Sequence, residues 1–215
     1  VEAAYPVPNL PAHPWPTRPD RDDFDEPALA YEWNFLRTPR DEFWSLTERP
    51  GSLCLKLRPE QLSERANPSF VGRRQQHISF EAKTAVLFTP HSPHESAGVV
   101  LIQNNDFHFR FVVTQTDAPV IRLIKRAGGE EEVLAEKSFA AGQFYLKVTA
   151  DEQTYNFYAA TELDEWQPIA EQVDGRILST PVAGGFVGAY IGMYASSSGH
   201  PSTNQAYFDW FDYLF

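Results

Sequence analysis

Carboxylates are the first side chains to consider for chemistry, because two of them about 5 to 9.5 Å apart can cleave a glycosidic bond. In a β-rich hydrolase, such acids stand at alternate positions of one strand and point into one cleft. The two densest acidic runs do not fit that pattern: residues 162–165 (ELDE) fall in an expected turn, and residues 130–132 (EEE) follow two glycines at an expected hairpin tip. We therefore expect no catalytic residues and no enzyme activity in this chain alone.

The histidines offer no second route to catalysis. His91 and His94 belong to a loop interrupted by Pro90 and Pro93, which cannot place both imidazoles on one helical face for a zinc ion. His108 is expected in mid-strand, and no Ser or Cys nucleophile stands with it and an acid in an evident pattern. The sequence therefore favours neither a zinc enzyme nor a Ser-His-Asp arrangement.

A structural calcium site is better motivated. Acidic residues open the folded part at residues 22–26 and recur near its end at Asp209 and Asp212. If the first and last strands pair, as in a jelly roll, Asp25 and Asp209 would meet, and a hard cation would take oxygen from both carboxylates and from backbone carbonyls. The alternative is that Asp209 and Asp212 lie on the solvent face of an edge strand. Calcium is thus an optional structural cofactor, and no cofactor is required.

Charge and composition exclude several classes of partner. Eighteen basic against twenty-nine acidic side chains give a net charge of −11, which repels phosphate backbones and anionic membrane surfaces. No apolar run approaches the roughly 18 residues of a membrane span. We expect no nucleic acid and no membrane partner, and the sequence does not indicate a cellular compartment. A surface of this kind is compatible with neutral ligands such as sugars. The single cysteine, Cys54, has no intrachain disulfide partner and is expected to be an ordinary strand residue.

Hydrophobic and polar residues alternate from Phe24 onward, which is the period of half-buried strands. Residues 53–57, 107–113 and 144–148 are examples, and clusters of turn residues separate them. Ten or more short strands at this spacing predict an all-β fold, a two-sheet antiparallel sandwich of the jelly-roll type. Residues 186–195 are among the further expected strands.

Helical signals are few, and the amino-terminal segment reads as a linker. Residues 58–65 (RPEQLSER) are expected to form one or two helical turns after Pro59. Seven of the 17 prolines lie in the first 27 residues, which favours an extended backbone. We assign residues 1–22 to a proline-rich linker and residues 23–215 to one β-sandwich domain. We expect the chain to be a piece of a longer one, because a linker of this kind typically holds two bodies apart.

Seven short motifs, weak one by one, stand in a telling order and spacing: residues 31–37 (YEWNFLR), 44–46 (WSL), 67–76 (NPSFVGRRQQ), 97–99 (AGV), 185–188 (GFVG), 191–195 (IGMYA) and 206–209 (AYFD). Together they resemble the C-terminal concanavalin A-like sandwich of family 43 glycoside hydrolases of the β-xylosidase type, over about residues 23 to 215. The resemblance implies that a five-bladed catalytic propeller with three carboxylates precedes this domain in the whole protein. The proline-rich start would be the connector.

The resemblance implies an accessory role for the sandwich. In that family the sandwich packs on the propeller, and one of its loops delivers an aromatic side chain to the rim of the xylose pocket. Residues 184–188 match this loop, and Phe186 is the expected rim residue, although Val187 stands where Thr often follows. Glycines allow the loop to protrude, and a phenyl face contacts sugar C–H groups while excluding water. The alternative is that Phe186 begins a buried strand.

Other polar and aromatic residues present similar choices. Arg73, Arg74 and Gln75, followed by Gln76, cannot all be buried unpaired, since each orphaned group would cost about 1 to 3 kcal/mol. We favour hydrogen bonds to the neighbouring domain over a position on the concave sheet face. The sequence also predicts that three tryptophans lie in the core rather than on a sugar platform, with the last indole packed inward: Trp33, Trp44 and Trp166.

Three hypotheses of different classes follow. The first is a noncatalytic C-terminal domain of a xylan-degrading exo-glycosidase that acts on xylo-oligosaccharides with inversion, of the β-1,4-xylosidase or arabinofuranosidase type, in a parent that we expect to be a homo-oligomer. The second is a free-standing carbohydrate-binding module for xylan-like glycans. The third is a scaffold that docks on the propeller and sets the oligomeric state. They differ in whether the chain alone binds sugar and whether Phe186 matters for turnover.

Overall fold

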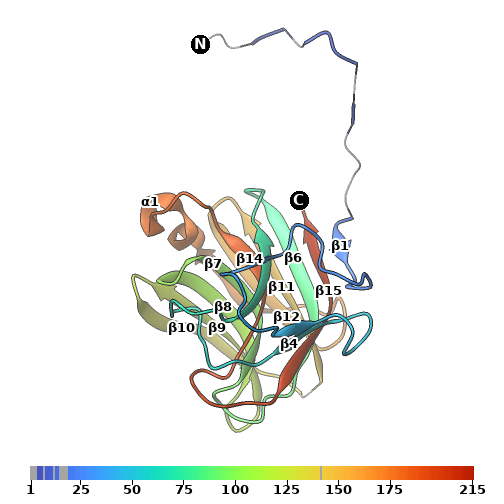
Figure 1. Ribbon diagram of the computed structural model, residues 1–215. Coiled ribbons are helices and arrows are strands. Elements are labelled where there is room, and N and C mark those ends of the chain that lie inside the picture. The colour runs from blue at the N-terminus through green and yellow to red at the C-terminus, as the bar shows by residue number, and fades with distance from the viewer. Residues whose placement is uncertain (1–3, 7, 12, 15–18, 141) are drawn as a thin grey trace.

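The alternation of apolar and polar residues produces the expected strands, and they form two stacked antiparallel sheets (Figure 1). A computed structural model describes residues 4–6, 8–11, 13–14, 19–140 and 142–215. Fifteen strands are present among them. The expectation of an all-β antiparallel sandwich is therefore confirmed.

The first sheet has eight strands, in the order β13-β12-β11-β6-β15-β4-β3 with β1 also paired to β15. The carboxy-terminal strand is thus internal, between β6 and β4. The strands are β1 (Arg21–Asp22), β3 (Trp44–Ser45), β4 (Leu53–Lys56), β6 (Phe80–Leu87), β11 (Gln143–Asp151), β12 (Thr154–Ala160), β13 (Gln167–Asp174) and β15 (Gln205–Leu214).

The second sheet has seven strands, in the order β10-β9-β8-β7-β14-β5-β2. Its long central strands are almost fully buried, because a core covers one face and a loop covers part of the other. The strands are β2 (Asn34–Phe35), β5 (Ser69–Arg74), β7 (Ser96–Asn104), β8 (Phe107–Gln115), β9 (Pro119–Ala127), β10 (Glu130–Ser138) and β14 (Tyr190–Ser196).

The core between the sheets consists of the inward-facing residues of both layers. Phe109 and Phe111 of β8 meet Phe157 of β12, and the Phe111 and Phe157 rings pack edge to face at 5.4 Å. Burial of each such side chain contributes about 1.5 to 3 kcal/mol. Cys54 is buried in β4, as expected of an ordinary strand residue, and burial, with Glu48 nearby, raises the pKa of its thiol to about 12.

A second hydrophobic cluster lies on the other face of the seven-stranded sheet. Leu62 covers Phe70, Val100, Ile102 and Tyr194 there. The segment that carries Leu62 forms turns and not the short helix expected over residues 58–65, so that prediction was wrong.

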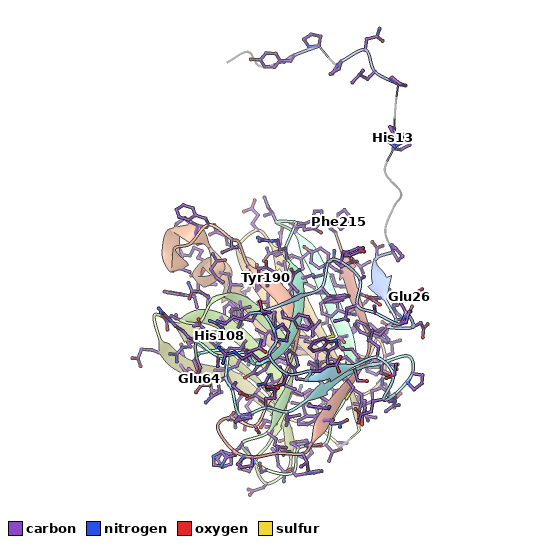
Figure 2. The ribbon with its side chains drawn as sticks, viewed as in Figure 1. His13, Glu26, Glu64, His108, Tyr190 and Phe215 are labelled. Carbon is purple, nitrogen blue, oxygen red and sulfur yellow. The ribbon has the colours of Figure 1, made fainter. Side chains whose placement is uncertain are left out.

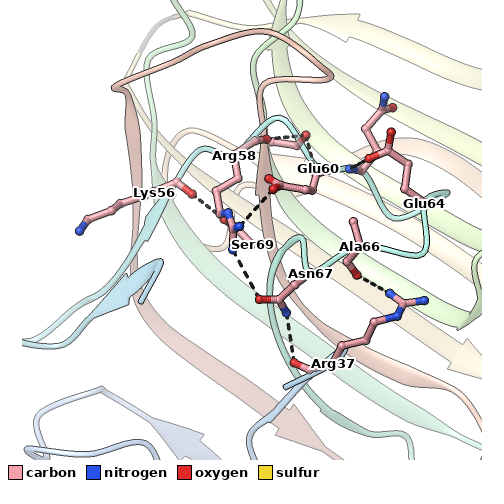
Figure 3. A network of polar contacts seen from close by, with 10 residues as sticks. Arg37, Lys56, Arg58, Glu60, Glu64, Ala66, Asn67 and Ser69 are labelled. Atoms are coloured by element: carbon pink, nitrogen blue, oxygen red, sulfur yellow. Dashed lines mark hydrogen bonds and ion pairs between the residues drawn. The ribbon is translucent and has the colours of Figure 1, made fainter. Parts of the chain in front are cut away.

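Side-chain bonds explain why this segment is not helical. The Arg58 guanidinium donates to Asn67 and Glu60, Asn67 donates to the Arg37 carbonyl, and Arg37 donates to the Ala66 carbonyl (Figure 3). These contacts hold the two ends of the loop against the segment that follows β2. They replace the backbone pairing that a helix would supply.

Two short helices join β13 to β14 and were not expected. They are η1 (Gly175–Leu178) and α1 (Thr180–Ala183). The Asp174 carboxylate accepts from the Arg176 backbone amide and caps η1, while Pro181 lies in the first turn of α1. Four residues give no apolar periodicity, so the sequence could not reveal either helix.

Strand β1 ties the amino-terminal side to the sandwich, at residues that the sequence assigned to the linker. Arg21 makes a bidentate ion pair with the buried Asp212 of β15, at 2.6 and 2.9 Å. Asp22 accepts from the indole nitrogen of Trp33 at 2.6 Å. The first and last strands therefore pair, as the calcium hypothesis assumed.

Candidate functional site: a protruding aromatic loop

The loop between α1 and β14 carries Phe186, whose side chain is fully exposed at 104% of its reference area. Gly184, Gly185 and Gly188 have φ of +72°, +83° and +75°, a region that disfavours residues with a Cβ. Strand β14 begins only at Tyr190. The expectation that a strand starts at Phe186 was therefore wrong, and the alternative in which this ring is buried is excluded.

Three side chains from the neighbouring strands hold the loop through its carbonyl groups. Gln103 of β7 donates to the Gly184 oxygen at 3.1 Å, and Asn104 donates to the Ala183 oxygen at 3.0 Å. Arg74 of β5 donates to the Val187 oxygen. The loop is consequently anchored on both sides of an exposed phenyl ring. No pattern in the sequence indicated the roles of Gln103 and Asn104, which lie some 80 positions before the loop.

Arg74 and Gln75 lie beside this loop because β5 pairs with β14. The Arg74 guanidinium lies 5.0 Å from the ring centre of Tyr190, and the Gln75 backbone amide donates to the Ala189 oxygen at 3.0 Å. The structure thus brings together Phe186, Arg74 and Gln75, which the sequence singled out separately.

The polar groups of this segment are used within the domain. The Tyr155 hydroxyl donates to Gln75 Oε1 at 3.0 Å, and burial raises the pKa of that tyrosine to about 12. Arg73 donates to Gln76 Oε1 at 3.2 Å, and its guanidinium lies 4.6 Å from the ring centre of Tyr213. A role of Arg73, Arg74 and Gln75 in contact with another domain stays a prediction.

Apolar side chains are exposed at the same end of the sandwich. Figure 1 shows the carboxy terminus and α1 at one end, and Phe215 is labelled there in Figure 2. The Phe215 ring stacks on His77 at 3.6 Å, next to the exposed Ile78. A hollow of about 360 Å³ joins this segment to the loop, with Ile78 on one side and Gly188 and Ala189 on the other.

The two carboxylates proposed for calcium approach one turn. Asp209 accepts from the Ser52 hydroxyl at 3.4 Å, and Asp25 lies beside Gly51. Asp212, by contrast, is engaged by Arg21. Within the described part of the chain, no three acidic, histidine or cysteine side chains converge as a metal site. Calcium would have to use two carboxylates and backbone carbonyls, and its binding stays a prediction.

One acidic run is placed as the sequence indicated and the other is not. Residues 162–165 lie in a turn, whereas residues 130–132 begin strand β10 and do not form the hairpin tip, because Gly128 and Gly129 alone make that turn. Glu131 pairs with Arg110 and Glu132 with Lys125, each at 2.6 Å. These carboxylates serve ion pairs across the β9–β10 edge of the sheet.

Trp33 and Trp44 pack against the core as expected, fully or in part, whereas Trp166 does not. Trp33 is buried against Phe211, and Trp44 is half-buried against Phe35. The Trp166 indole does not pack inward: it lies on the outer face of the eight-stranded sheet, 4.4 Å from the Lys147 ammonium. Lys147 alternates with inward residues of β11, so its partner must lie outside the core.

The comparisons with known proteins agree with this architecture. The family described as the beta xylosidase C-terminal concanavalin A-like domain matches residues 21–214. The chain belongs to this family. Its match begins at strand β1 and ends with β15, so it covers both sheets and the loop with Phe186.

The relatives of this chain are longer proteins that contain a matching domain. A non-reducing end α-L-arabinofuranosidase of Bacteroides ovatus is 38% identical over 99% of this chain and 40% of the relative. A xylosidase/arabinosidase of Butyrivibrio fibrisolvens is 36% identical over 91% of the chain and 38% of the relative. The chain thus spans about 40% of the length of these relatives and matches the C-terminal domain of family 43 enzymes.

Solved structures show the same fold at similar identity. The Bacteroides ovatus family 43 protein of a xyloglucan utilisation locus superposes with a TM-score of 0.92 at 38% identity, over 97% of this chain and 42% of that one. A xylan β-1,4-xylosidase from Bacillus halodurans gives 0.90 at 32% identity, over 97% and 41%. Among the described residues, no helix has the length and apolar character needed to cross a membrane.

Proposed function

We propose that this chain is the noncatalytic accessory domain of an exo-glycosidase of the β-xylosidase or arabinofuranosidase type. It packs on a catalytic propeller of the same protein and places Phe186 at the rim of the sugar pocket. The observation that carries the proposal is the fully exposed phenyl ring on an anchored, glycine-rich loop. Binding residues are often carried by loops that a rigid scaffold positions.

The anchoring of the loop supports a role at a rim. Three side chains fix its carbonyl groups, so less conformational entropy is lost when the ring meets a sugar. A phenyl face offers C–H contacts to a sugar ring and excludes water from the reacting bond. The domain would therefore contribute to binding and closure, while the reacting carboxylates belong to the propeller.

The exposed apolar groups at the same end support docking there. Four apolar residues are exposed here, namely Phe186, Val187, Ile78 and Phe215. Arg74 and Gln75 lie beside the loop, and their side chains bond within the domain. An apolar centre with a polar border is the usual composition of an interface between domains. Oligomerisation of the whole protein is a further part of the proposal.

The first experiment asks whether the chain alone is an enzyme. The purified 215-residue chain is incubated with aryl β-xyloside and aryl α-arabinofuranoside, and release of the aryl group is followed. We expect no turnover above an equal concentration of an unrelated protein. Release that is saturable and survives repurification would contradict the noncatalytic assignment.

The second experiment tests Phe186 in a chimera. This chain replaces the matching domain of the Bacteroides ovatus arabinofuranosidase, and kcat/KM is measured. Phe186→Ala is expected to lower kcat/KM by about tenfold or more, because pocket closure is lost. Tyr31→Ala removes another fully exposed ring and should leave kcat/KM within about twofold.

The same chimera separates the rim role from a scaffold role. Size-exclusion chromatography of each variant reports its assembly. If Phe186→Ala keeps full turnover and changes the oligomeric state, the scaffold hypothesis replaces the proposal. Equal loss of activity in both alanine variants would also contradict a specific role for Phe186.

A further inference from the structure

A second hollow lies on the outer face of the seven-stranded sheet, away from the interior core. Its volume is about 270 Å³. Its floor comes from outward-facing residues of β7, β8 and β9, and its walls come from β10 and from three loops. Its lining includes Gln61, Ser96, Arg110, Arg122, Glu131 and Val133.

Two polar side chains on the floor are buried without a hydrogen-bond partner for one of their atoms. Arg110 is 8% exposed and Ser96 is 6% exposed. The Arg110 Nε and the Ser96 Oγ have no partner among the described residues. Buried polar atoms in native proteins almost always have a partner, either in the protein or in a bound molecule. The floor of the hollow is therefore polar, although these two atoms have almost no accessible surface of their own.

The charges that line the hollow are matched. Arg110 pairs with Glu131 at 2.6 Å, and Arg122 pairs with Glu136 at 2.5 Å. An anion would meet the carboxylates and a cation would meet the guanidiniums, so neither is favoured. A pair of this kind presents hydrogen-bond donors next to acceptors, an arrangement that suits adjacent hydroxyl groups.

Apolar side chains lie among the polar ones. Val112, Ile124 and Val133 face the same space. A sugar ring offers C–H groups on its faces and hydroxyl groups on its edge, so it matches apolar side chains beside paired charges. The volume lies near the lower end of the range for small-molecule sites and is suited to a single ring.

One wall is held firmly in place. Gln61 belongs to the loop that precedes β5, and its backbone amide donates to the Glu64 carboxylate at 2.9 Å. The bonds of Figure 3 fix both ends of that loop, and Leu62 packs under it on the sheet. The hollow is thus a preformed feature, which reduces the entropic cost of binding.

We propose that this sheet-face hollow binds one neutral sugar ring, such as the end of a xylo-oligosaccharide. It would give the accessory domain a binding function of its own, independent of the loop with Phe186. The guanidinium and carboxylate groups receive the hydroxyls, and the ring lies against the exposed Val133.

The test uses the 215-residue chain labelled with ¹⁵N. D-Xylose, methyl β-D-xyloside and xylobiose are titrated by NMR and calorimetry, with D-galacturonate as the anionic comparison. We expect saturable binding of a neutral sugar with Kd of about 1 to 10 mM, amide shifts centred on β8 to β10, and weaker binding of galacturonate. Raising NaCl from 0.05 to 0.5 M should change Kd by less than about twofold, because the ligand is uncharged.

Variants assign the binding to this hollow. Glu131→Gln and Arg122→Gln should each weaken binding by about fivefold or more. Arg40→Gln is the matched control, since Arg40 is exposed and does not line the hollow, and it should leave Kd unchanged. Circular dichroism and urea unfolding confirm that each variant is folded.

Two results would overturn the inference. One is the absence of saturable binding for all three neutral sugars up to about 100 mM, far above the Kd expected for a site of this size. The other is binding that Phe186→Ala abolishes while Glu131→Gln and Arg122→Gln leave it intact, which would place the ligand at the loop. Neither result bears on the chimera experiment, so the two proposals fail separately.

Discussion

Gly72 and Gly192 face each other across strands β5 and β14. A Cβ at residue 192 would lie 2.3 Å from both the Gly72 Cα and the Val71 oxygen. These are backbone atoms in a sheet interior, so they cannot move aside. We expect Gly192→Ala to lower the free energy of unfolding by at least about 1 to 3 kcal/mol, measured by urea denaturation.

A glycine with open space around it provides the control for that change. At Gly188 a Cβ would meet nothing within 4 Å, and only the positive φ opposes substitution. Gly188→Ala should therefore cost about 1 kcal/mol. Equal destabilisation by the two variants would mean that the close approach of β5 and β14 does not limit residue size.

His108 should make the domain less stable in mild acid. Burial, with a contribution from the nearby Arg110, lowers the pKa of His108 from 6.5 to about 3. The unfolded chain therefore binds a proton between these values that the folded chain does not, so stability falls as pH falls from about 6.5. Between pH 7 and pH 5 the loss is about 2 kcal/mol.

Urea unfolding at both pH values measures this effect. His108→Gln removes the titrating group and should abolish most of the difference between pH 7 and pH 5. His94→Gln, in the exposed 89–95 loop, should retain it. If both variants keep the wild-type pH dependence, His108 is not the group responsible.

Calcium gives a further test at the scale of single side chains. If Asp25 and Asp209 share an ion at the Gly51–Ser52 turn, calcium at about 1 mM should raise the thermal midpoint above its value in excess chelator. The gain in the free energy of unfolding is about RT ln(1 + [L]/Kd). Asp209→Asn should remove that shift. A midpoint that is the same with calcium and with chelator in the wild-type chain would contradict the calcium prediction.

At the scale of elements, the loop with Phe186 depends on strands that are distant in sequence. Arg74→Gln removes the bond from β5 to the Val187 oxygen. We expect faster hydrogen exchange at amides 184–189, with a loss of global stability of only about 1 kcal/mol. Arg176→Gln, at the start of η1, should not accelerate exchange at Ala189. Unchanged exchange in Arg74→Gln would show that Gln103 and Asn104 suffice to hold the loop.

The strands were predictable and the loop was not, for a physical reason. Alternation along residues 107–113 and 144–148 is a local pattern with the period of a pleated strand, so it identified β8 and β11. The position of Phe186 depends on side chains of β5 and β7. No local pattern encodes those contacts, and the glycines alone indicated only that the backbone could turn.

At the scale of the whole molecule, strand β1 is the part of the amino-terminal side that contributes to the stability of the sandwich. The described residues before residue 15 are all exposed, whereas β1 contributes the Arg21–Asp212 and Asp22–Trp33 bonds. Removal of residues 1–14 should leave the thermal midpoint unchanged. Removal of residues 1–23 should lower it by several degrees, because an ion pair to a buried carboxylate is lost. Equal midpoints for the two truncations would contradict this.

The candidate site was partly predictable at this scale. Phe186 was identified by resemblance to a family, Arg74 and Gln75 were identified as polar residues that need partners, and the pairing of β5 with β14 explains why they meet. The sheet-face hollow could not be predicted, because its residues come from four strands and three loops and extend along the chain from Gln61 to Ser198. Only the register of the strands places Ser96, Arg110 and Arg122 on one face.

The internal position of β15 has a consequence for biosynthesis. Residues 205–214 pair with β4 and β6 at once, so a nascent chain that stops before residue 205 leaves the edges of both strands open. The eight-stranded layer cannot close until the last residues of this domain have left the ribosome. A propeller encoded upstream would have that interval in which to fold first. A premature stop codon within β15 would yield an aggregation-prone, protease-sensitive product, and not a shortened but folded domain.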